Sequence, residues 1–440
     1  MPNCRRALLA IACTLVAVTP SLAQPPAAIG LEEAMAAALE NNRVIKTALA
    51  EEHIAEANYQ QTNAVFLPRV GLSYTAMTSN SPINVFGYKL QQQSITVSDF
   101  DPQLLTNPSS TPNFMTTIDV EQPLINWDQM LQRKSVQKQI LSSHLNTVRT
   151  RDMIIFEVKK AYHELQLAHQ GVTVAEEALT SIQATYVFTQ NRFNSGLLQK
   201  SDLLNVEIQL RATETQLAQA KSQVINVSGH LSLLMGRPAG TAYQTEPINE
   251  ALAEVLPQQS LPPNRADLGA MQNAIEASDF AARSARMGYL PRLNAFGSYQ
   301  LIDADWLGFG SHFFLAGIQL SWNIFQGTKT RNTVLARRLE RDKALEQFNE
   351  MKAQGQLELD KTQRQLADTQ YAIRQQQAAV AHAGEVLRIL ENRYHQGLAN
   401  TTDILTSHTQ LAQQKLSLAQ TLFSYQVTKA YLHFLTSSSN

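Results

Sequence analysis

The chain has 440 residues, of which 44% are hydrophobic and 17% are charged, and its formal net charge is −1. This balance lacks the basic excess of a nucleic-acid-binding protein and gives no support for that function. The two cysteines, Cys4 and Cys13, lie near the amino terminus, so the rest of the chain has neither a disulfide framework nor a thiol catalyst.

Residues 1–23 have the composition of a secretory signal peptide. Two arginines precede the apolar run 7–18, and a small-x-small cleavage pattern ends just before Gln24. Removal of this segment takes away two arginines and no acids, which changes the net charge from −1 to −3. A lipid anchor at Cys13 is the competing interpretation, but Ala10 stands where such a signal normally has leucine.

The rest of the sequence is one pattern written twice. The segment Asn191–Leu197 recurs as Asn392–Leu398, 201 positions later, and apolar residues at seven-residue spacing on both sides agree at the same shift. A second correspondence lies upstream, where residues 67–69 (Leu-Pro-Arg) recur as residues 290–292. The two halves are therefore predicted to have the same order of elements.

The seven-residue spacing predicts long helices that pack as coiled coils. Residues 127–194 and 328–395 contain no proline, and at about 1.5 Å per residue each would form a rod of roughly 100 Å. A glycine-bearing turn then reverses the chain, and a shorter helix returns to about Met235 in one half and Leu435 in the other. Two further helices are predicted to precede the strands, at about 31–64 and 265–288.

Four segments of about ten residues alternate apolar and polar side chains, which predicts four β-strands. Residues 80–113, between the first two strands, are rich in Ser, Pro, Asn and Asp and are predicted to form a long surface loop. Residues 303–311 are its short counterpart in the second half. The strands begin at about Val70, Phe114, Leu293 and Phe314.

Alternation alone favours two half-buried hairpins of a soluble domain, and two other features favour a membrane barrel. The chain has a secretion signal, and four strands cannot close a barrel. Lipid provides no water to bond the open edges of a sheet. The strands are therefore predicted to be completed by other copies of the chain.

In this order the motifs resemble the outer-membrane efflux protein family, the TolC-like exit ducts. They are the duplicated Arg-aromatic-x-x-Gly-Leu…Asp-(Leu/Ile)-Leu signature, the strand-opening Leu-Pro-Arg and the Trp-Asn-Ile-Phe-Gln-Gly segment after the last strand. The resemblance implies an α+β membrane protein that forms a homotrimer. Four strands per protomer give a twelve-stranded β-barrel, continuous with a long α-helical coiled-coil barrel, and each protomer has an internal two-fold structural repeat.

The resemblance also implies a function without enzymatic chemistry or a cofactor. Such a duct passively conducts substrate across the periplasm and outer membrane of a Gram-negative bacterium, within a tripartite efflux pump or a type I secretion system. The implied partners are a periplasmic adaptor of the membrane-fusion type, an inner-membrane RND- or ABC-type transporter and outer-membrane lipid. The expected organisation is a signal peptide (1–23), a first repeat (24–236), a linker (237–263) and a second repeat (264–440).

Residue roles carry over from the resemblance at the tip of the helical hairpins and at the strand ends. The residues matching the adaptor-contacting tip are Gly196, Leu197, Gly397 and Leu398. Those matching the periplasmic gate are Asp403, Asp202 and Thr406. Those expected at strand–helix junctions, where proline's missing donor is tolerated, are Pro68, Pro123 and Pro291.

The alternative interpretation is that the glycines and acids among these residues only cap the ends of helices. Each glycine is equally consistent with an ordinary helix C-cap, and Asp202 and Asp403 with caps of the returning helices. Thr406 stands where the family prototype has a second acid, and Ala399 where it has a base. The resemblance therefore does not extend to a doubled acidic ring with a locking salt bridge.

The sequence shows no catalytic or metal-binding constellation. His163-Glu164 lacks the second histidine of a zinc-protease helix, and the ten histidines form no cluster at metal-ligand spacing. The competing functions are a periplasmic adaptor, which would have one hairpin with added Gly-rich domains, and a secreted hydrolase with coiled-coil arms. The sequence leaves the cargo open among drugs, metal ions and secreted proteins.

Overall fold

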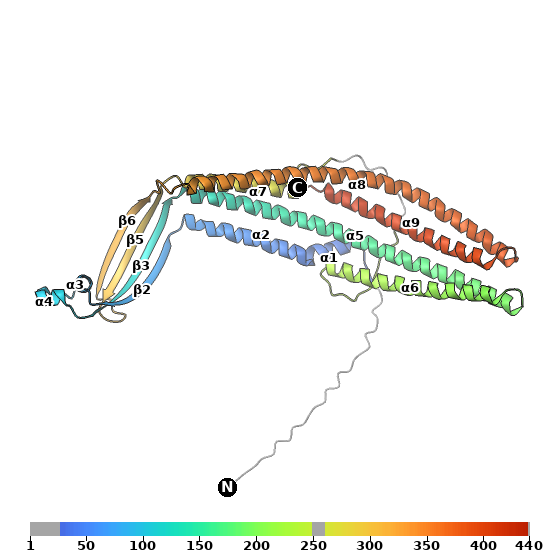
Figure 1. The fold of residues 1–440 in the computed structure, drawn as a ribbon, viewed down its shortest axis with the longest axis horizontal. Helices are drawn as coiled ribbons and strands as arrows, with labels where there is room; N and C mark the ends of the chain where they lie inside the picture. Colours follow the sequence, from blue (N-terminus) through green and yellow to red (C-terminus); the bar gives the residue numbers. More distant parts are fainter. Residues whose placement is uncertain (1–26, 249–259, 439–440) are drawn as a thin grey trace, which may run out of the picture. The chain divides into compact units, whose positions relative to one another are not determined.

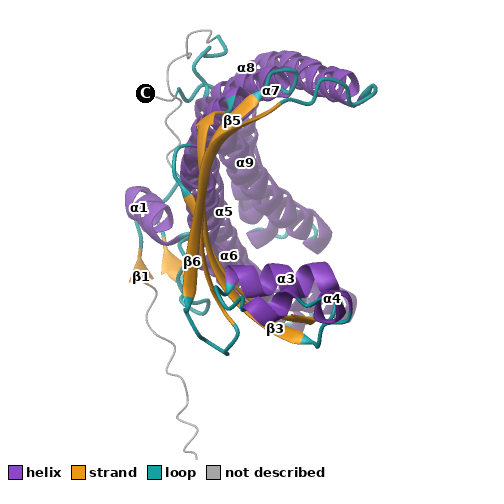
Figure 2. Cartoon of the chain, turned by 90° about the vertical axis from the view of Figure 1, so that its left-hand side faces the viewer, coloured by secondary structure: helices purple, strands orange, loops and turns teal. Residues whose placement is uncertain are grey.

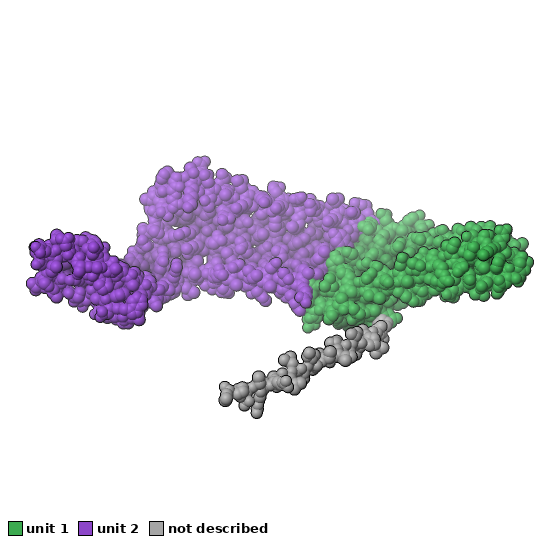
Figure 3. All heavy atoms as spheres, turned by 60° about the horizontal axis from the view of Figure 1, so that its bottom comes forward, with its two compact units in different colours: residues 1–42, 155–255, 365–430 green, residues 43–154, 256–364, 431–440 purple. Residues whose placement is uncertain are grey.

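The computed structural model describes residues 27–248 and 260–438 (Figure 1). The predicted signal peptide lies outside the described residues, as does the 249–259 part of the linker. The chain divides into two compact units (Figure 3). Each unit draws on both halves of the sequence. Unit 1 comprises Met1–Asn42, Ile155–Val255 and Gln365–Ala430, and unit 2 comprises Arg43–Ile154, Leu256–Arg364 and Tyr431–Asn440.

Unit 2 contains a four-stranded antiparallel sheet in the order β2-β3-β5-β6. Each half of the sequence supplies one hairpin, and the two hairpins join through β3 and β5. Strands β2 and β6 are the edges of this sheet. The strands are β2 (Arg69–Ser79), β3 (Thr111–Ile125), β5 (Arg292–Asp303) and β6 (Ser311–Ser321), which confirms the four predicted segments.

The strand register gathers the predicted apolar side chains on one face of the sheet. Ile118 pairs with Leu72 on one side and with Tyr299 on the other, and Tyr299 pairs with Phe314. Directly opposed residues point to the same face. This face is called the apolar face below, and its apolar residues are Val70, Leu72, Tyr74, Ala76, Phe114, Ile118, Val120, Leu293, Ala295, Tyr299, Leu301, Phe314, Ala316, Ile318 and Leu320.

Much of the apolar face is open to the surroundings of the chain. Leu72 is 74% exposed and Phe314 is 82% exposed, although large apolar side chains normally avoid water. The opposite face, called the polar face below, carries most of the polar side chains of the sheet. Its residues include Ser73, Thr75, Met77, Asn113, Thr117, Asp119, Asn294, Ser298, Gln300, Ile302, Gln319 and Ser321.

The predicted loop between the first two strands contains three short helical segments, α3 (Pro82–Gln91), η2 (Val97–Phe100) and α4 (Pro102–Thr106). Both α-helices begin with proline, whose fixed φ suits the first helical position. At α4 the Asp101 side chain accepts a hydrogen bond of 2.8 Å from the backbone N–H of Gln103. Local capping therefore orders a stretch whose composition indicated only a loop.

The three junction prolines lie at or near the strand ends. Pro68 separates the helical turn η1 (Thr62–Val65) from β2, and Pro291 separates α7 (Ala266–Met287) from β5. Pro123 lies inside β3, two residues before its end, beside a register shift between Pro123 and Ile125. A residue without an N–H is tolerated at such an irregularity.

The helices of the hairpins begin and end close to the predicted residues. None of the described helices has a run apolar enough to cross a lipid bilayer. The first hairpin consists of α5 (Trp127–Asn194) and α6 (Lys200–Leu234), and the second of α8 (Lys329–His395) and α9 (Thr401–Leu435). Residues at the seven-residue spacing are buried as expected, among them Leu165, Leu231, Leu359, Ile373, Ile404 and Tyr425.

The prediction of one helix over residues 31–64 is wrong. Helix α1 (Leu31–Asn41) ends at Asn42, and α2 (Arg43–Gln61) begins after it. The backbone of Asn42 is extended (φ −60°, ψ 131°), and its side-chain Nδ2 donates a hydrogen bond of 2.7 Å to the carbonyl of Leu234. Unit 1 also has a two-stranded parallel sheet that was not predicted, formed by β1 (Ala27–Ala28) and β4 (Tyr243–Gln244).

Candidate gate at the tip of the helical hairpins

The two tip turns have the same backbone geometry. Gly196 and Gly397 have φ of 73° and 79°, a region that glycine enters without steric cost. In each turn the glycine N–H and the following leucine N–H donate back to carbonyls three and five residues earlier. This is the glycine C-cap that ends many helices. It leaves the side chains of Leu197 and Leu398 exposed at the end of unit 1.

The two acids after the turns have different local roles. Asp202 accepts a hydrogen bond from the backbone N–H of Gln199 and forms a capping box at the start of α6. In α9 the cap is Asn400, whose Oδ1 accepts a hydrogen bond of 2.8 Å from the backbone N–H of Asp403. The side chains of Asp403 and Thr406 are exposed. Asp403 is therefore not occupied as the cap of its own helix.

A hydrogen-bonded cluster that the sequence did not indicate joins the two hairpins just inside the turns. The Tyr394 hydroxyl lies 2.8 Å from Thr189 Oγ1 on α5 and 3.3 Å from Thr401 Oγ1 on α9. Arg192 Nη1 donates to the Tyr394 carbonyl at 3.3 Å, and its guanidinium lies 5.4 Å from the Phe188 ring. Residues Tyr394, Thr189, Thr401 and Arg192 are called the tip clasp below.

The hydroxyl-bearing residues of the tip clasp are buried, and the clasp links three helices of unit 1. Tyr394 is 2% exposed and Thr189 is fully buried, so their hydroxyls meet away from water, where an unpaired group costs free energy. The sequence placed Tyr394 among the apolar residues at seven-residue spacing, where Phe193 is its counterpart. The only sequence difference that could have indicated a polar contact is the hydroxyl of Tyr394, which Phe193 lacks.

A second polar contact between α5 and α9 is centred on His408. Its Nδ1 lies 3.2 Å from Ser181 Oγ, and its Nε2 lies 3.2 Å from Thr185 Oγ1. The side chain is almost completely buried, and Glu391 on α8 is 3.9 Å away. Burial lowers the pKa of His408 to about 4. The imidazole is therefore neutral at neutral pH and holds α9 to two hydroxyls of α5.

We expect the stability of the protein to fall as the pH is lowered from about 6.5 to 4. In this window the unfolded chain binds a proton on His408 that the folded chain excludes, so protonation favours unfolding. A depression of this size corresponds to roughly 3 kcal/mol per chain at pH 4. Over this pH range the melting temperature of the wild type should fall more steeply than that of His408→Gln. Parallel curves would show that His408 does not titrate in this way.

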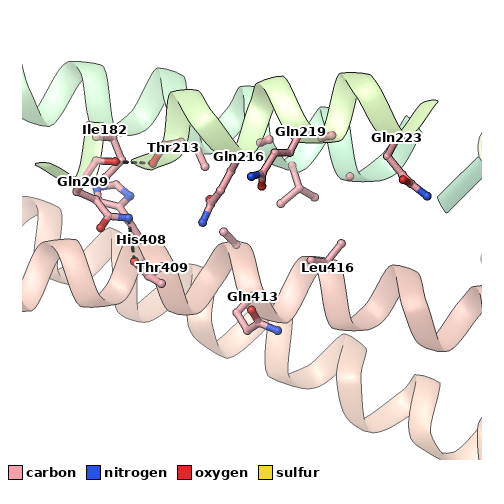
Figure 4. A pocket seen from close by; sticks show the side chains of 16 residues that line it. Ile182, Gln209, Thr213, Gln216, Gln219, Gln223, His408, Thr409, Gln413 and Leu416 are labelled. Atoms are coloured by element: carbon pink, nitrogen blue, oxygen red, sulfur yellow. Dashed lines mark hydrogen bonds between the residues drawn. The ribbon is translucent and has the colours of Figure 1, made fainter. Parts of the chain in front are cut away.

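Beside His408 a groove of about 520 Å³ lies between the α5–α6 hairpin and α9 (Figure 4). Gln209 donates to Thr409 at its edge over 3.5 Å. The groove lining consists of apolar, threonine and glutamine side chains together with His408, so it offers hydrogen bonds without a fixed charge. The glutamines that line it are Gln209, Gln216, Gln219, Gln223 and Gln413. Within residues 27–248 and 260–438, no three His, Cys, Asp or Glu side chains converge on a metal site.

The chain matches the family model described as Outer membrane efflux protein over residues 34–237 and 256–437. The alkaline protease secretion protein AprF of Pseudomonas aeruginosa is 22% identical over 437 residues, covering 92% of this chain and 84% of that protein. The cation efflux system protein CusC of Escherichia coli K12 is 20% identical over 277 residues, covering 61% of this chain and 55% of that protein.

Solved structures agree with this fold. A crystal structure of CusC has a TM-score of 0.79 at 17% identity, covering 95% of this chain and 96% of that chain. The outer membrane channel CmeC of Campylobacter jejuni has a TM-score of 0.78 at 17% identity, covering 92% and 85%. The protein belongs to the outer membrane efflux protein family and serves as an outer-membrane exit duct.

Proposed function

We propose that three copies of this chain close one twelve-stranded β-barrel, each copy supplying β2, β3, β5 and β6. The observation that carries this proposal is the sheet itself, which has two edge strands and an exposed apolar face. Lipid would cover the apolar face, and strand β6 of one copy would pair with β2 of the next. Pairing of this kind satisfies the backbone groups that an open edge would leave unbonded in lipid.

The two helical hairpins of each copy would form the wall of a coiled-coil tube continuous with the barrel. A periplasmic adaptor would contact the exposed Leu197 and Leu398 at the glycine turns, and an inner-membrane RND- or ABC-type transporter would supply the cargo. The names of two relatives, a protease secretion protein and a cation efflux protein, support a type I secretion system or an efflux pump. The attached transporter would select the cargo.

Fractionation and electrical recording test this proposal. The protein should sediment with the outer membrane and produce discrete ion currents in planar bilayers. A protein found only in the soluble periplasmic fraction, with no currents, would rule out the proposed twelve-stranded barrel.

The proposed periplasmic gate includes a ring of Asp403 side chains around the axis of the assembly, with Thr406 one helical turn further along α9. Asp403 is exposed and is not the cap of α9. Its carboxylate is therefore available to face the pore, where a ring of acids attracts cations. Asp202, which caps α6, is proposed to support the turn. Pro68, Pro123 and Pro291 are proposed to set the geometry between strands and helices.

We expect Asp403→Ala to weaken the block of single-channel current by divalent cations, because the substitution removes one negative charge per copy from the constriction. Asp202→Ala is the matched control. It removes a charge at the equivalent position of the other hairpin and is expected to loosen the turn while leaving the block in place. Equal block in wild type and Asp403→Ala would leave Asp403 without a role in the gate.

A further inference from the structure

The two connections at one end of the sheet fold onto opposite faces. The β5–β6 turn lies against the apolar face, where the Trp306 ring packs on Tyr74 and Phe114 with ring centroids 5.3 and 5.6 Å apart. The backbone N–H of Leu307 also donates to the Tyr74 hydroxyl at 3.1 Å. Tyr74 and Phe114 both belong to the apolar face. This short turn therefore stays on the side of the sheet that carries the exposed apolar residues.

The longer β2–β3 connection folds onto the polar face. The Tyr88 hydroxyl donates to Met77 Sδ at 3.0 Å, and Gln92 Nε2 donates to Asn113 Oδ1 at 2.9 Å. Met77 and Asn113 oppose each other across β2 and β3 and share the polar face. A third contact reaches the same face, because Ser311, paired with Ile302, donates from Oγ to the Gln91 carbonyl at 2.5 Å.

These contacts bury part of the polar face that would otherwise be open. Asn113 and Ser311 are each 1% exposed, and Ile302 is fully buried. Figure 2 shows α3 and α4 on the concave side of the curved sheet. The connection therefore contacts the polar face where the strands end, and Figure 1 shows α3 and α4 beyond these strand ends.

The β2–β3 connection is also ordered by contacts within itself. Lys89 Nζ lies 2.5 Å from Asp99 Oδ1, and Asp99 Oδ2 accepts a hydrogen bond of 2.7 Å from the backbone N–H of Thr96. These bonds, with the Lys89 contact first among them, lower the pKa of Asp99 to about 2. The rings of Phe86 and Phe100 meet edge to face at 5.8 Å. The connection is thus a small folded body.

We infer that residues 82–106 form a cap over the outer mouth of the pore. This inference rests on the proposed function, in which the apolar face contacts lipid and the polar face lines the pore. A folded body on the pore-lining face at the end of the strands must occupy part of the mouth. With one cap per copy, the outer mouth becomes a constriction additional to the proposed periplasmic gate. This constriction limits the size of solutes that enter from outside.

Polymer exclusion in planar bilayers tests the cap. Polyethylene glycols of graded size are added to one side of the membrane at a time, and the largest polymer that lowers the pore current is recorded for each side. The test variant replaces residues 82–106 with a short Gly-Ser linker. The matched control replaces residues 305–309, the turn on the apolar face, in the same way.

Removal of the cap should raise the exclusion limit from the outer side and leave the limit from the periplasmic side unchanged. The control should match the wild type from both sides. If the exclusion limit from the outer side is the same in all three proteins, the cap is contradicted and the proposed function is not. A wild-type chain that forms no pore would overturn the proposed function and the cap with it.

If the variant with the Gly-Ser linker does not insert in the membrane, a double point variant tests the cap instead. Tyr88→Phe with Gln92→Ala removes two of the contacts that hold the cap to the polar face while keeping its interior intact. This variant should also raise the outer exclusion limit, and Trp306→Ala on the opposite face should not. An unchanged limit in the double variant, with normal insertion, would contradict the cap.

Discussion

Replacing Tyr394 with phenylalanine is expected to raise the ionic leak through the closed duct while the protein still inserts in the outer membrane. The substitution keeps the ring and removes only the hydroxyl that joins Thr189 on α5 to Thr401 on α9. Loss of such a buried hydrogen bond costs about 1 kcal/mol per copy. If three copies open together, the closed state would lose about 3 kcal/mol, roughly a hundredfold shift toward the open state.

The leak should be measured as closed-state conductance in planar bilayers. Tyr371→Phe is the matched control, because it makes the same chemical change on the same helix at a side chain that is 65% exposed. Tyr371→Phe should behave as the wild type. Identical closed-state conductance in the Tyr394 and Tyr371 variants would show that the tip clasp does not hold the gate.

Arg149→Met is expected to cause the largest loss of stability. In unit 2 the Arg149 guanidinium lies 3.6 Å from the centre of the Phe434 ring and donates to the Phe434 carbonyl at 2.9 Å and to Ser437 Oγ at 3.2 Å. It is also within 4.0 Å of carboxylate oxygens of Asp152 and Asp267. A single side chain of α5 thus contacts the end of α9, the residue Ser437 that follows it, and α7.

Methionine keeps much of the apolar stem but provides neither the charge nor the donors. Removing one partner from a mostly buried charge network costs about 2–4 kcal/mol, and the melting temperature should fall accordingly. Arg388→Met is the control, since Arg388 is exposed and pairs with Glu385 on the surface of α8, where ion pairs contribute little. Equal melting temperatures for both variants would exclude the anchoring role of Arg149.

The sequence predicted the long-range features of the fold because they repeat over many residues. Seven-residue spacing predicted a long helix, and the absence of proline from residues 127–194 placed its ends close to the observed ends of α5, Trp127 and Asn194. Strict alternation likewise predicted which strand side chains share a face, and the register of β2 with β3 confirms it. Patterns of this length average over local irregularities, so they indicate which face is buried more reliably than where an element is interrupted.

The features that the sequence missed depend on one or two residues. The break at Asn42 depends on one side chain reaching the carbonyl of Leu234, 192 positions away. Helices α3 and α4 had a signal that could have been used, because Ser81-Pro82 and Asp101-Pro102 each place a capping residue before proline. Composition masked this signal, since the same residue types are typical of loops.

The candidate site shows the same division. The repeated glycine turns were located from the sequence, and their positive φ explains why glycine stands there. The resemblance directed attention to acids near the turns, yet the hairpins are joined just inside the turns by a cluster that includes hydroxyls of threonine and tyrosine. Hydroxyls carry no pattern of their own in a sequence, because they are common both in buried helices and on surfaces.

In the proposed duct, the four-stranded sheet of one chain is completed by other copies of the chain. The most direct test is the mass of the protein extracted from the outer membrane in a mild detergent, measured by light scattering with the detergent contribution subtracted. We predict an assembly with the mass of three mature chains. A stable monomer under these conditions would contradict the claim, because a single sheet with two open edges could not span the membrane.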